Sequence, residues 1–408
     1  MKKVPRLRFR GFQEDWEQCK LGRMASFSKG NGYSKADLIE EGHPLILYGR
    51  LYTKYETIIE SVDTFAKLQD KSILSKGGEV IVPSSGESAE DISRASVVDV
   101  AGVVLGGDLN IIKTNSELNP TFLALTISNG SQQKEMSKRA QGKSIVHLHN
   151  SDLKEINLLY PKIEEQIYIG LFFKKLEDTI NLHQRKLDQL KELKKAYLQV
   201  MFPVKDERAP KLRFADFEGE WEQCKLEDYA TYRRGSFPQP YGNKKWYDGE
   251  NAMPFVQVID VTEQLSLVKD TKQKISKLAQ SKSVFVSAGK VVVTLQGSIG
   301  RVAITQYNSY IDRTLLVFES YEKETDEYFW AYTIQQKFEI EKRKAPGGTI
   351  KTITKEALSS FEVNFPEYEE QQKNGNFLKN LDNILTLDQK KLDQLKSLKK
   401  SYLQNMFI

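Results

Sequence analysis

The chain repeats itself at a fixed offset of 205 residues, and no other feature restricts its possible folds as much. The stretch KLDQLKELKKAYLQVMF at residues 186–202 recurs as KLDQLKSLKKSYLQNMF at residues 391–407. The opening PRLRFRGFQEDWEQCKL at residues 5–21 recurs at the same offset as PKLRFADFEGEWEQCKL, and the segments that begin at Gly142 and Gly347 also correspond. Because self-similarity at one period indicates repeated structural units, a single duplication of a whole unit accounts for all three matches.

Between these repeated segments the two halves share a pattern but little identity, over residues from about 27 to 135 and from about 231 to 340. Each half has a strand-like run before a Gly/Ser loop, in GGEVIVPSSGES from Gly77 and AGKVVVTLQGSIG from Ala288. Other β-rich runs and the helical segments at residues 120–128 and 327–342 follow the same order in both halves. The pattern predicts an α+β fold with a β-rich core in each half.

A long helix is expected to close each half. Pro161 and Pro366 precede the acidic pairs 164–165 and 369–370, which is typical of a helix start, and nothing interrupts a helix before Met201 or Met406. Apolar residues alternate four and three apart, which predicts a coiled-coil seam. His183 and Asp388 fall at equivalent seam positions, where they either fix the register or mark an exposed end. At about 38 residues each helix would be ~55 Å long, roughly the length of 16 base pairs.

The lysines on the outer positions of these helices have two interpretations. They form either an ordinary solvated face or a docking surface for partner helices or phosphates. The positions concerned are Lys191, Lys194, Lys195, Lys396, Lys399 and Lys400.

The composition is that of an ordinary globular protein. The 60 Lys and Arg residues against 55 Asp and Glu give a net charge of +5, which permits nucleic acid as a partner without implying it. No signal peptide and no apolar run of ~18 residues is present, so we expect a cytoplasmic protein without a membrane span. Cys19 and Cys224 occupy the same pentapeptide in the two halves, which argues against a disulfide between them, and two thiols alone cannot build a zinc site.

Motifs of enzymes are incomplete in this sequence. Residues 141–144 (QGKS) end like a phosphate-binding loop, but Ser137 stands where the motif needs a glycine. Residues 119–122 (NPTF) are similar to the NPPF motif of adenine methyltransferases, but Pro120 is better interpreted as a helix start. His147 and His149 alternate on a strand-like segment without further metal ligands. We therefore expect no catalytic residue, no metal and no cofactor.

Over its whole length the chain resembles the specificity (S) subunit of type I restriction-modification systems. The motifs that carry the resemblance are a Trp-x-x-x-Lys-Leu opening, a Gly/Ser loop after a strand, a Gly-x-x-Ile segment and a closing helix that ends in Leu-x-x-Met-Phe. They occur in this order in both halves, at residues 16–21, 84–86, 142–145 and 198–202, and at residues 221–226, 296–300, 347–350 and 403–407.

The resemblance implies two pseudo-symmetric target recognition domains joined by two long antiparallel coiled-coil helices. The implied boundaries are residues 1–160 and 204–366 for the recognition domains, and 161–203 and 367–408 for the conserved spacer helices. It also implies a non-catalytic subunit that binds two methyltransferase (M) subunits, directs adenine methylation to a bipartite, asymmetric DNA target, and supports restriction when restriction (R) subunits join. The alternative is a stand-alone coiled-coil scaffold carrying two binding modules, which would bind without a methyltransferase and show no base preference.

Candidate DNA contacts combine basic side chains, which bind phosphates, with side chains that can reach base edges. The first module has Gly86-Glu87 where the second has Gly297-Ser298, so no loop role is assigned to Glu87. In the first half the candidates are Lys29, Tyr33, Ser34, Lys35, Tyr48, Arg50, Ser84, Ser85, Arg139 and Lys143. In the second half they are Arg233, Arg234, Ser236, Gln239, Tyr241, Gln296, Ser298, Arg301, Lys344, Thr349 and Lys351. The helix residues expected to bind partners are Leu187, Leu190, Tyr197, Leu392, Leu395 and Tyr402.

Overall fold

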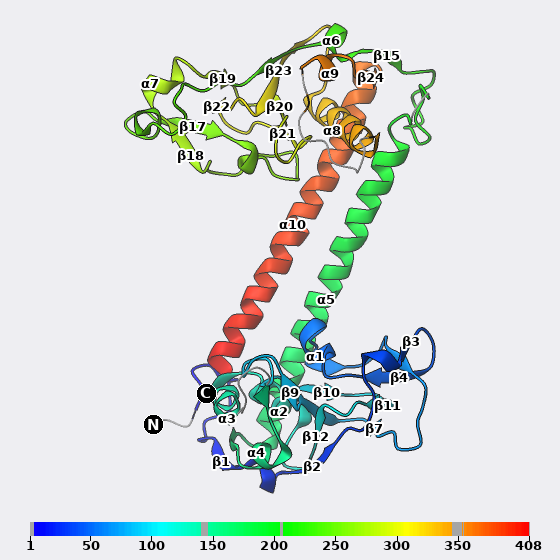
Figure 1. Cartoon of the computed structure of the whole chain (residues 1–408), viewed down its shortest axis with the longest axis vertical. Coiled ribbons are helices and arrows are strands. Elements are labelled where there is room, and N and C mark those ends of the chain that lie inside the picture. The colour runs from blue at the N-terminus through cyan, green and yellow to red at the C-terminus, as the bar shows by residue number, and fades with distance from the viewer. Residues whose placement is uncertain (1–3, 140–145, 205–206, 345–352, 354, 408) are drawn as a thin grey trace. The chain divides into compact units, whose positions relative to one another are not determined.

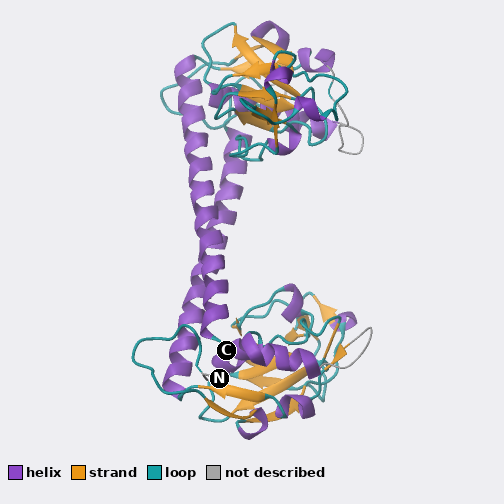
Figure 2. Ribbon diagram, turned by 90° about the vertical axis from the view of Figure 1, so that its left-hand side faces the viewer, coloured by secondary structure: helices purple, strands orange, loops and turns teal. Residues whose placement is uncertain are grey.

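The chain folds into two compact units, each of which contains part of both long helices (Figure 1). The structure, a computed structural model, describes residues 4–139, 146–204, 207–344, 353 and 355–407. The first unit comprises Met1–Gln184 and Lys390–Ile408, and the second comprises Arg185–Gln389. Strands and helices are mixed in both units, as Figure 2 shows, so the predicted α+β fold is confirmed.

Two five-stranded sheets form the β-rich core of the first unit. One has the order β2-β12-β8-β10-β5 and the other β3-β6-β4-β11-β7. Their strands are β2 (Ala25–Lys29), β3 (Leu38–Ile39), β4 (His43–Ile46), β5 (Ile58–Ile59), β6 (Phe65–Ala66), β7 (Leu74–Lys76), β8 (Glu79–Pro83), β10 (Ser96–Val98), β11 (Ala101–Leu105) and β12 (Leu109–Thr114). The short helices are η1 (Leu21–Arg23), η2 (Lys35–Asp37), α1 (Arg50–Thr53), α2 (Pro120–Ile127), α3 (Gly130–Arg139) and α4 (Asn150–Lys154).

The apolar run of β8 lies in the middle of the first sheet, and α2 packs against β8 and β10. The Asn119 side chain caps α2 by accepting the Phe122 N–H at 3.0 Å, and Pro120 opens the helix. This confirms the interpretation of residues 119–122 as a helix start, since Pro is preorganised for the first helical position and Asn for the cap.

Two four-stranded sheets take the corresponding places in the second unit, with the orders β16-β23-β20-β21 and β18-β17-β22-β19. The strands are β16 (Ala230–Arg234), β17 (Met253–Val256), β18 (Gln273–Ile275), β19 (Val284–Val286), β20 (Val291–Thr294), β21 (Val302–Ile304), β22 (Ser309–Ile311) and β23 (Leu315–Tyr321). The helices are α6 (Leu226–Tyr229), η3 (Lys244–Trp246), η4 (Val258–Asp260), α7 (Lys277–Gln280), α8 (Glu327–Lys344) and α9 (Lys355–Ser359). Helix α8 covers β20 and β21 and contributes Phe329, Trp330 and Phe338 to the core.

A two-stranded antiparallel sheet of identical register leads into each long helix. In the first unit β1 (Glu17–Lys20) pairs with β14 (Asn157–Tyr160), and in the second β15 (Glu222–Lys225) pairs with β24 (Glu362–Phe365). Glu17 lies opposite Tyr160 and Glu222 opposite Phe365, so both partners shift by the same 205 residues. The duplication seen in the sequence is therefore a duplication of strand pairing.

The long helices are α5 (Ile163–Val200) and α10 (Tyr368–Met406), and their segments pair antiparallel within each unit. In the first unit the Phe172 and Tyr402 rings meet edge to face at 5.0 Å, and Glu177 pairs with Lys399. In the second unit the Tyr197 and Phe377 rings meet at 4.8 Å, and Lys194 pairs with Asp382 at 2.5 Å. The predicted antiparallel coiled coil is confirmed.

The six helix residues expected to bind partners are instead occupied within the chain. Leu187 and Leu392 are each 1% exposed, and Tyr197 and Tyr402 pack against the cores of their units. Leu190 and Leu395 are half-buried. Apolar side chains at seam positions are the ones that the coiled coil itself buries, so these residues cannot offer a partner a free surface.

A buried ion pair fastens the start of each long helix to the segment that precedes the first strand of its unit. The Arg8 guanidinium binds Glu165 at 2.8 and 2.7 Å, and Arg213 binds Glu370 at the same two distances. Each of these glutamates is 1% exposed. Their acidity was expected to serve the helix dipole, but each carboxylate is satisfied by a two-point contact with an arginine that the sequence places 157 residues away.

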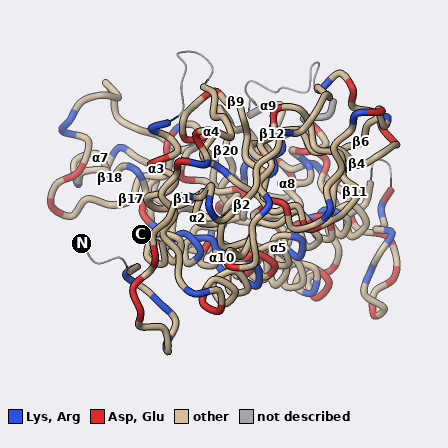
Figure 3. The backbone as a smooth tube through the Cα atoms, turned by 90° about the horizontal axis from the view of Figure 1, so that it is seen from below, with Lys and Arg blue, Asp and Glu red and all other residues tan. Residues whose placement is uncertain are grey.

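Charge is distributed without a large single-sign segment. Figure 3 shows Lys and Arg interspersed with Asp and Glu along the backbone, α5 and α10 included. No helix among the described residues is long and apolar enough to cross a bilayer.

Candidate nucleic-acid interface

A glycine at the end of the first sheet strand positions the first candidate loop in each unit. A Cβ atom at Gly30 would lie 1.9 Å from the Gly106 carbonyl oxygen, and one at Gly235 would lie 2.2 Å from the Asp312 oxygen. Only glycine allows so close an approach of two backbone segments. Gly30 and Gly235 are 205 residues apart and each follows a basic residue, Lys29 or Arg234, so the repeat offset could have revealed this pair inside the regions of little identity.

In the first unit this loop presents Lys29 and Lys35 to solvent. Both are exposed, at the end of β2 and the start of η2, and neither has an ion-pair partner among the described residues. The Ser34 hydroxyl caps η2 by accepting the Ala36 N–H, and the Tyr33 hydroxyl donates to the Lys67 carbonyl at 3.2 Å. The two lysines are thus free for phosphates, whereas Tyr33 and Ser34 hold the loop in shape.

Arg50 was expected to contact DNA, but the structure places it inside the unit. It is buried, and its guanidinium donates to Asp63, Glu56 and the Ser61 carbonyl at 2.6 to 3.0 Å. Hydrogen bonds from Lys54 and from Arg50 hold the pKa of Asp63 well below its usual range, so the carboxylate stays ionised. An arginine satisfied in this way supports the fold, and we do not retain it as a DNA contact.

Ser84 is also unsuited to reach DNA because it is buried between backbone partners. Its N–H donates to the Asp108 carbonyl, and its own carbonyl accepts the Leu148 N–H. The neighbouring Ser85 belongs to the short strand β9 (Ser85–Gly86), which pairs with β13 (Val146–His147), and its carbonyl accepts the Tyr52 hydroxyl at 2.9 Å.

The other first-unit candidates have mixed exposure. Tyr48 is exposed and meets the Tyr52 ring edge to face at 5.9 Å. Arg139 ends α3, where it pairs with Glu135 at 3.2 Å and is half-buried. Lys143 lies outside the described residues, as do Thr349 and Lys351 of the second unit, and Lys344 is described only as the last residue of α8.

In the second unit the structure brings candidates from two loops together through η4. The Tyr241 hydroxyl donates to Asp312 at 2.9 Å and accepts from the Gln257 amide, which directly precedes η4. Burial first, and then Asp312, raises the pKa of Tyr241, so the hydroxyl remains a donor. A Cβ atom on Gly297 would lie 3.5 Å from the Val258 side chain in η4, which places the Gln296–Ser298 loop on the other side of the same element.

The exposed polar side chains around this junction are suited to contact a nucleic acid. Arg233 is exposed and paired with Glu319 at 2.8 Å, and the Arg234 Nε donates to the Arg313 carbonyl. Gln239 and Ser298 are exposed, Gln296 is half-buried, and the Ser236 hydroxyl donates to the Lys282 carbonyl at 3.1 Å. Arg301 lies 3.5 Å from Glu263 across a weak surface pair. Arginine and glutamine can each form two hydrogen bonds to a base edge.

Two basic residues of this cluster were not predicted from the sequence. Lys282 lies 5.3 Å from the Trp246 ring, beside Lys245 at 4.3 Å, and Arg313 lies 5.7 Å from the Tyr241 ring. These cations come from segments far apart in the chain, so only the fold reveals that they gather on the same aromatic side chains.

Metal or catalytic chemistry finds no support in this region. Among the described residues no group of three or more His, Cys, Asp or Glu side chains could hold a metal ion. The His147 and His149 rings stack at 6.4 Å on the first unit without such a group. Cys19 and Cys224 are free thiols at equivalent positions of β1 and β15.

Comparison with known families gives this arrangement its biological context. Residues 13–192 and 218–397 each match the type I restriction modification DNA specificity domain, so two copies account for most of the chain. The chain belongs to the type I restriction-modification specificity subunits. Such specificity subunits are non-catalytic components of their systems, which agrees with a surface of loops and cations rather than a reactive centre.

Relatives of this specificity subunit match it nearly from end to end. Two come from Methanocaldococcus jannaschii: the putative type I restriction enzyme MjaX specificity subunit is 22% identical, and the MjaVIII specificity subunit is 20% identical. Each alignment covers 95% of this chain and 91% of the relative.

Solved structures show the same fold. The S subunit of the type I restriction-modification system of M. genitalium aligns with a TM-score of 0.64 at 14% identity, over 99% of both chains. A chain from a structure that addresses complex assembly and conformational transition of a type I R-M system aligns with a TM-score of 0.56 at 16% identity, over 95% of this chain and 96% of that one.

Proposed function

We propose that the two units read the two halves of a bipartite, asymmetric DNA target for methyltransferase and restriction subunits. One observation carries the proposal: the specificity domain occurs twice, with identical strand pairing at its base and different loops at its surface. Two equal scaffolds with unequal loops are what two unequal half-sites require. The recognition domains would span residues 1–160 and 204–366, and the spacer helices residues 161–203 and 367–408. Since DNA would be the target, the cytoplasm would be the place of action.

Sequence choice would come from the exposed side chains around the loops. Lys29 and Lys35 would neutralise phosphates in one half-site. In the other half-site Arg233, Arg234 and Gln239 would reach bases, and Lys245, Lys282 and Arg313 would hold the backbone. Family membership removes the support for the alternative of a stand-alone scaffold without base preference.

The decisive experiment maps methylated adenines across the genome of a host that expresses the cognate methyltransferase subunit with or without this chain. We expect methylation at a two-part motif only when this chain is present. Methylation of the same motif in its absence would contradict the proposal.

Replacing Arg233 with alanine is expected to weaken discrimination at one position of one half-site by about 1–3 kcal/mol, because a two-point contact with a base edge would be lost. The measurement is competition binding of the assembled complex to duplexes with single base changes. Arg208→Ala, an exposed arginine near Glu220 outside the loops, is the matched control and should change nothing. An equal loss on all duplexes would make Arg233 a phosphate contact instead.

Partner docking is proposed for apolar side chains that the seam leaves exposed. Leu182 and Leu387 occupy equivalent helix positions and are 67% and 66% exposed. Leu193 and Leu398 form a second equivalent pair, also exposed. Equivalent surfaces on two repeats suit two copies of one partner, so we assign these leucines to the two methyltransferase subunits.

Changing Leu182 and Leu387 to glutamate is therefore expected to abolish copurification of the methyltransferase subunit. Each leucine should contribute about 1.5–3 kcal/mol when a partner buries it, and a buried carboxylate adds a penalty. The Leu182→Glu single variant should retain one of the two methyltransferase copies. Leu212→Glu, at an exposed leucine outside the helices, serves as the control. Retention of both copies by the double variant would exclude this surface.

A further inference from the structure

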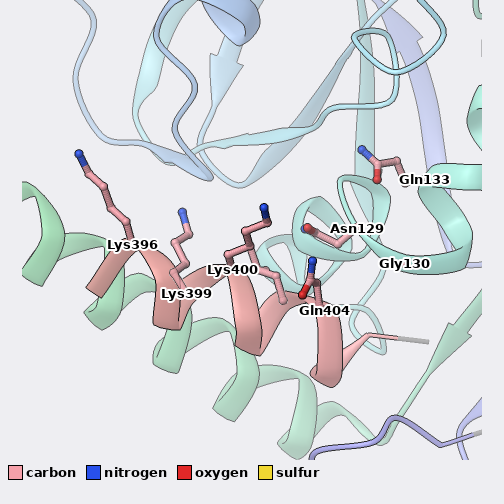
Figure 4. A pocket seen from close by; sticks show the side chains of 8 residues that line it. Asn129, Gly130, Gln133, Lys396, Lys399, Lys400 and Gln404 are labelled. Atoms are coloured by element: carbon pink, nitrogen blue, oxygen red, sulfur yellow. The ribbon is translucent and has the colours of Figure 1, made fainter. Parts of the chain in front are cut away.

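A pocket of about 400 Å³ in the first unit lies between the last turns of α10 and the turn that joins α2 to α3. We call it the lysine pocket, and the loops considered above contribute nothing to it. Figure 4 shows three lysine side chains extending from one side of α10, with amide side chains across from them. Its lining consists of Asn129, Gly130, Gln133, Lys396, Lys399, Lys400, Leu403 and Gln404.

The charge of the lysine pocket is only partly compensated. Lys399 pairs with Glu177, and that carboxylate also accepts the Thr57 hydroxyl at 2.6 Å. Lys396 reaches the uncharged Gln184 amide oxygen at 3.2 Å, and Lys400 has no ion-pair partner in the described part of the chain. Three ammonium groups therefore face one carboxylate, which leaves an excess of about two positive charges for an anion to neutralise.

Neutral donors surround these ammonium groups. The side-chain amides of Asn129, Gln133 and Gln404 line the pocket, and α3 begins at Gly130 on its rim. First-turn N–H groups of a helix lack acceptors within the helix, so they add to the positive potential. Lysines for charge together with amides for direction match the oxygens of a phosphate.

The second repeat keeps the lysines but is built differently across from them. Lys191, Lys194 and Lys195 are the equivalents at the 205-residue offset, and Lys194 is held by Asp382 and the Tyr332 ring. The cap residues Asn119 and Asp326 bond the N–H three residues ahead in α2 and α8, which aligns Gly130 with Lys337. Helix α8 runs through that position without a break, and Lys337 pairs with Glu341. The helix start at Gly130 is therefore specific to the first repeat.

We propose that the lysine pocket binds phosphates of the DNA backbone, which makes the first unit a stronger holder of the duplex than its loops alone. This inference rests on the proposed DNA-reading function. The rise from Lys396 to Lys400 along α10 is about 6 Å, close to the ~6.8 Å that two phosphates of one strand advance along the duplex. Contacts of this kind position the protein without reading sequence.

The test compares salt dependence of DNA binding for full-length variants. Lys396→Gln with Lys400→Gln leaves the Lys399–Glu177 pair in place and is expected to lower the slope of log K against log salt by about 1.8, or 0.9 for each phosphate. Affinity should fall equally for target and non-target duplexes. The matched control, Lys191→Gln with Lys195→Gln, should leave the slope unchanged. Gln133→Glu, which adds a carboxylate without removing a lysine, should lower the slope as well and guards against a folding defect in the lysine variant.

An unchanged slope in both pocket variants, or an equal loss in the control, would overturn the proposal. Titration with tripolyphosphate separates the possible sources of phosphate: binding that the pocket variant abolishes, with the DNA slope intact, would assign the pocket to a free polyphosphate. Loss of the methyltransferase subunit with the DNA slope intact would assign it to an acidic protein segment, against our proposal. Failure of the proposed function differs from all of these, because the wild-type complex would then show no sequence preference while the slopes still responded.

Discussion

Removal of residues 182–188 from α5 together with residues 387–393 from α10 is expected to shorten the gap of the DNA target by about three base pairs. The two segments are equivalent at the 205-residue offset, and a seven-residue deletion preserves the heptad register of the seam. Each helix loses about 10 Å, and duplex DNA rises ~3.4 Å per base pair. Both half-site sequences should survive, because no loop of either unit is altered. The readout is the methylated motif in a genome-wide map.

The control for this deletion keeps both helix lengths and exchanges the two segments. LHQRKLD and LDQKKLD differ at only two positions, so the exchange tests composition without a change of length. The motif should remain as in the wild type. New bases within a half-site after the deletion, with the gap unchanged, would show that the helices do not set the spacing.

Replacement of Arg8 with alanine is expected to lower the free energy of unfolding of the first unit by about 3–5 kcal/mol. The change leaves the Glu165 carboxylate, which is 1% exposed, without its two-point partner, and an uncompensated buried charge is costly. Urea unfolding of the full-length chain measures the effect. Arg10→Ala, two residues away on an exposed side chain, should change the stability by less than about 0.5 kcal/mol.

A double change distinguishes the loss of the ion pair from the loss of packing. Arg8→Met with Glu165→Leu removes both charges and replaces them with side chains of similar size, so most of the lost stability should return. If the double variant is no more stable than Arg8→Ala, packing by the arginine stem rather than the buried charge is the cause. The equivalent pair Arg213–Glu370 predicts the same behaviour in the second unit.

The sequence predicted those parts of the fold that depend on periodicity and repetition. The seam spacing predicted α5 and α10, Pro120 predicted the start of α2, and the common offset predicted matched strand pairs. These features arise from short-range preferences or from copying, and both are visible in one sequence.

Features that depend on tertiary contact were missed or misinterpreted. Arg50 appeared to be a free cation, but Asp63 and Glu56 neutralise it within the unit. Leu187 and Leu392 were assigned to partners, although the seam consumes them and leaves Leu182 and Leu387 exposed. Sequence spacing identifies an apolar stripe but cannot show which part of the chain already covers it.

Loop residues were the hardest to predict because neighbours distant in sequence decide their availability. Lys282 and Arg313 join the cluster around Trp246 and Tyr241 only through the fold of the second unit. Gly30 and Gly235 could have been found, since they share the repeat offset and each follows a basic residue. A search for glycines at the offset would have located the base of both loops.

The pairing of β1 with β14 and of β15 with β24 has a consequence for inheritance. The Leu7 N–H bonds the Asn405 carbonyl after α10, as the Leu212 N–H bonds the Val200 carbonyl after α5, so each unit is attached to a helix end in the same manner. Genes that carry this duplicated stretch offer matching sites for homologous recombination inside the helices. A crossover there would exchange one complete set of variable loops and leave every conserved junction intact, so that a new target specificity could arise in a single genetic event.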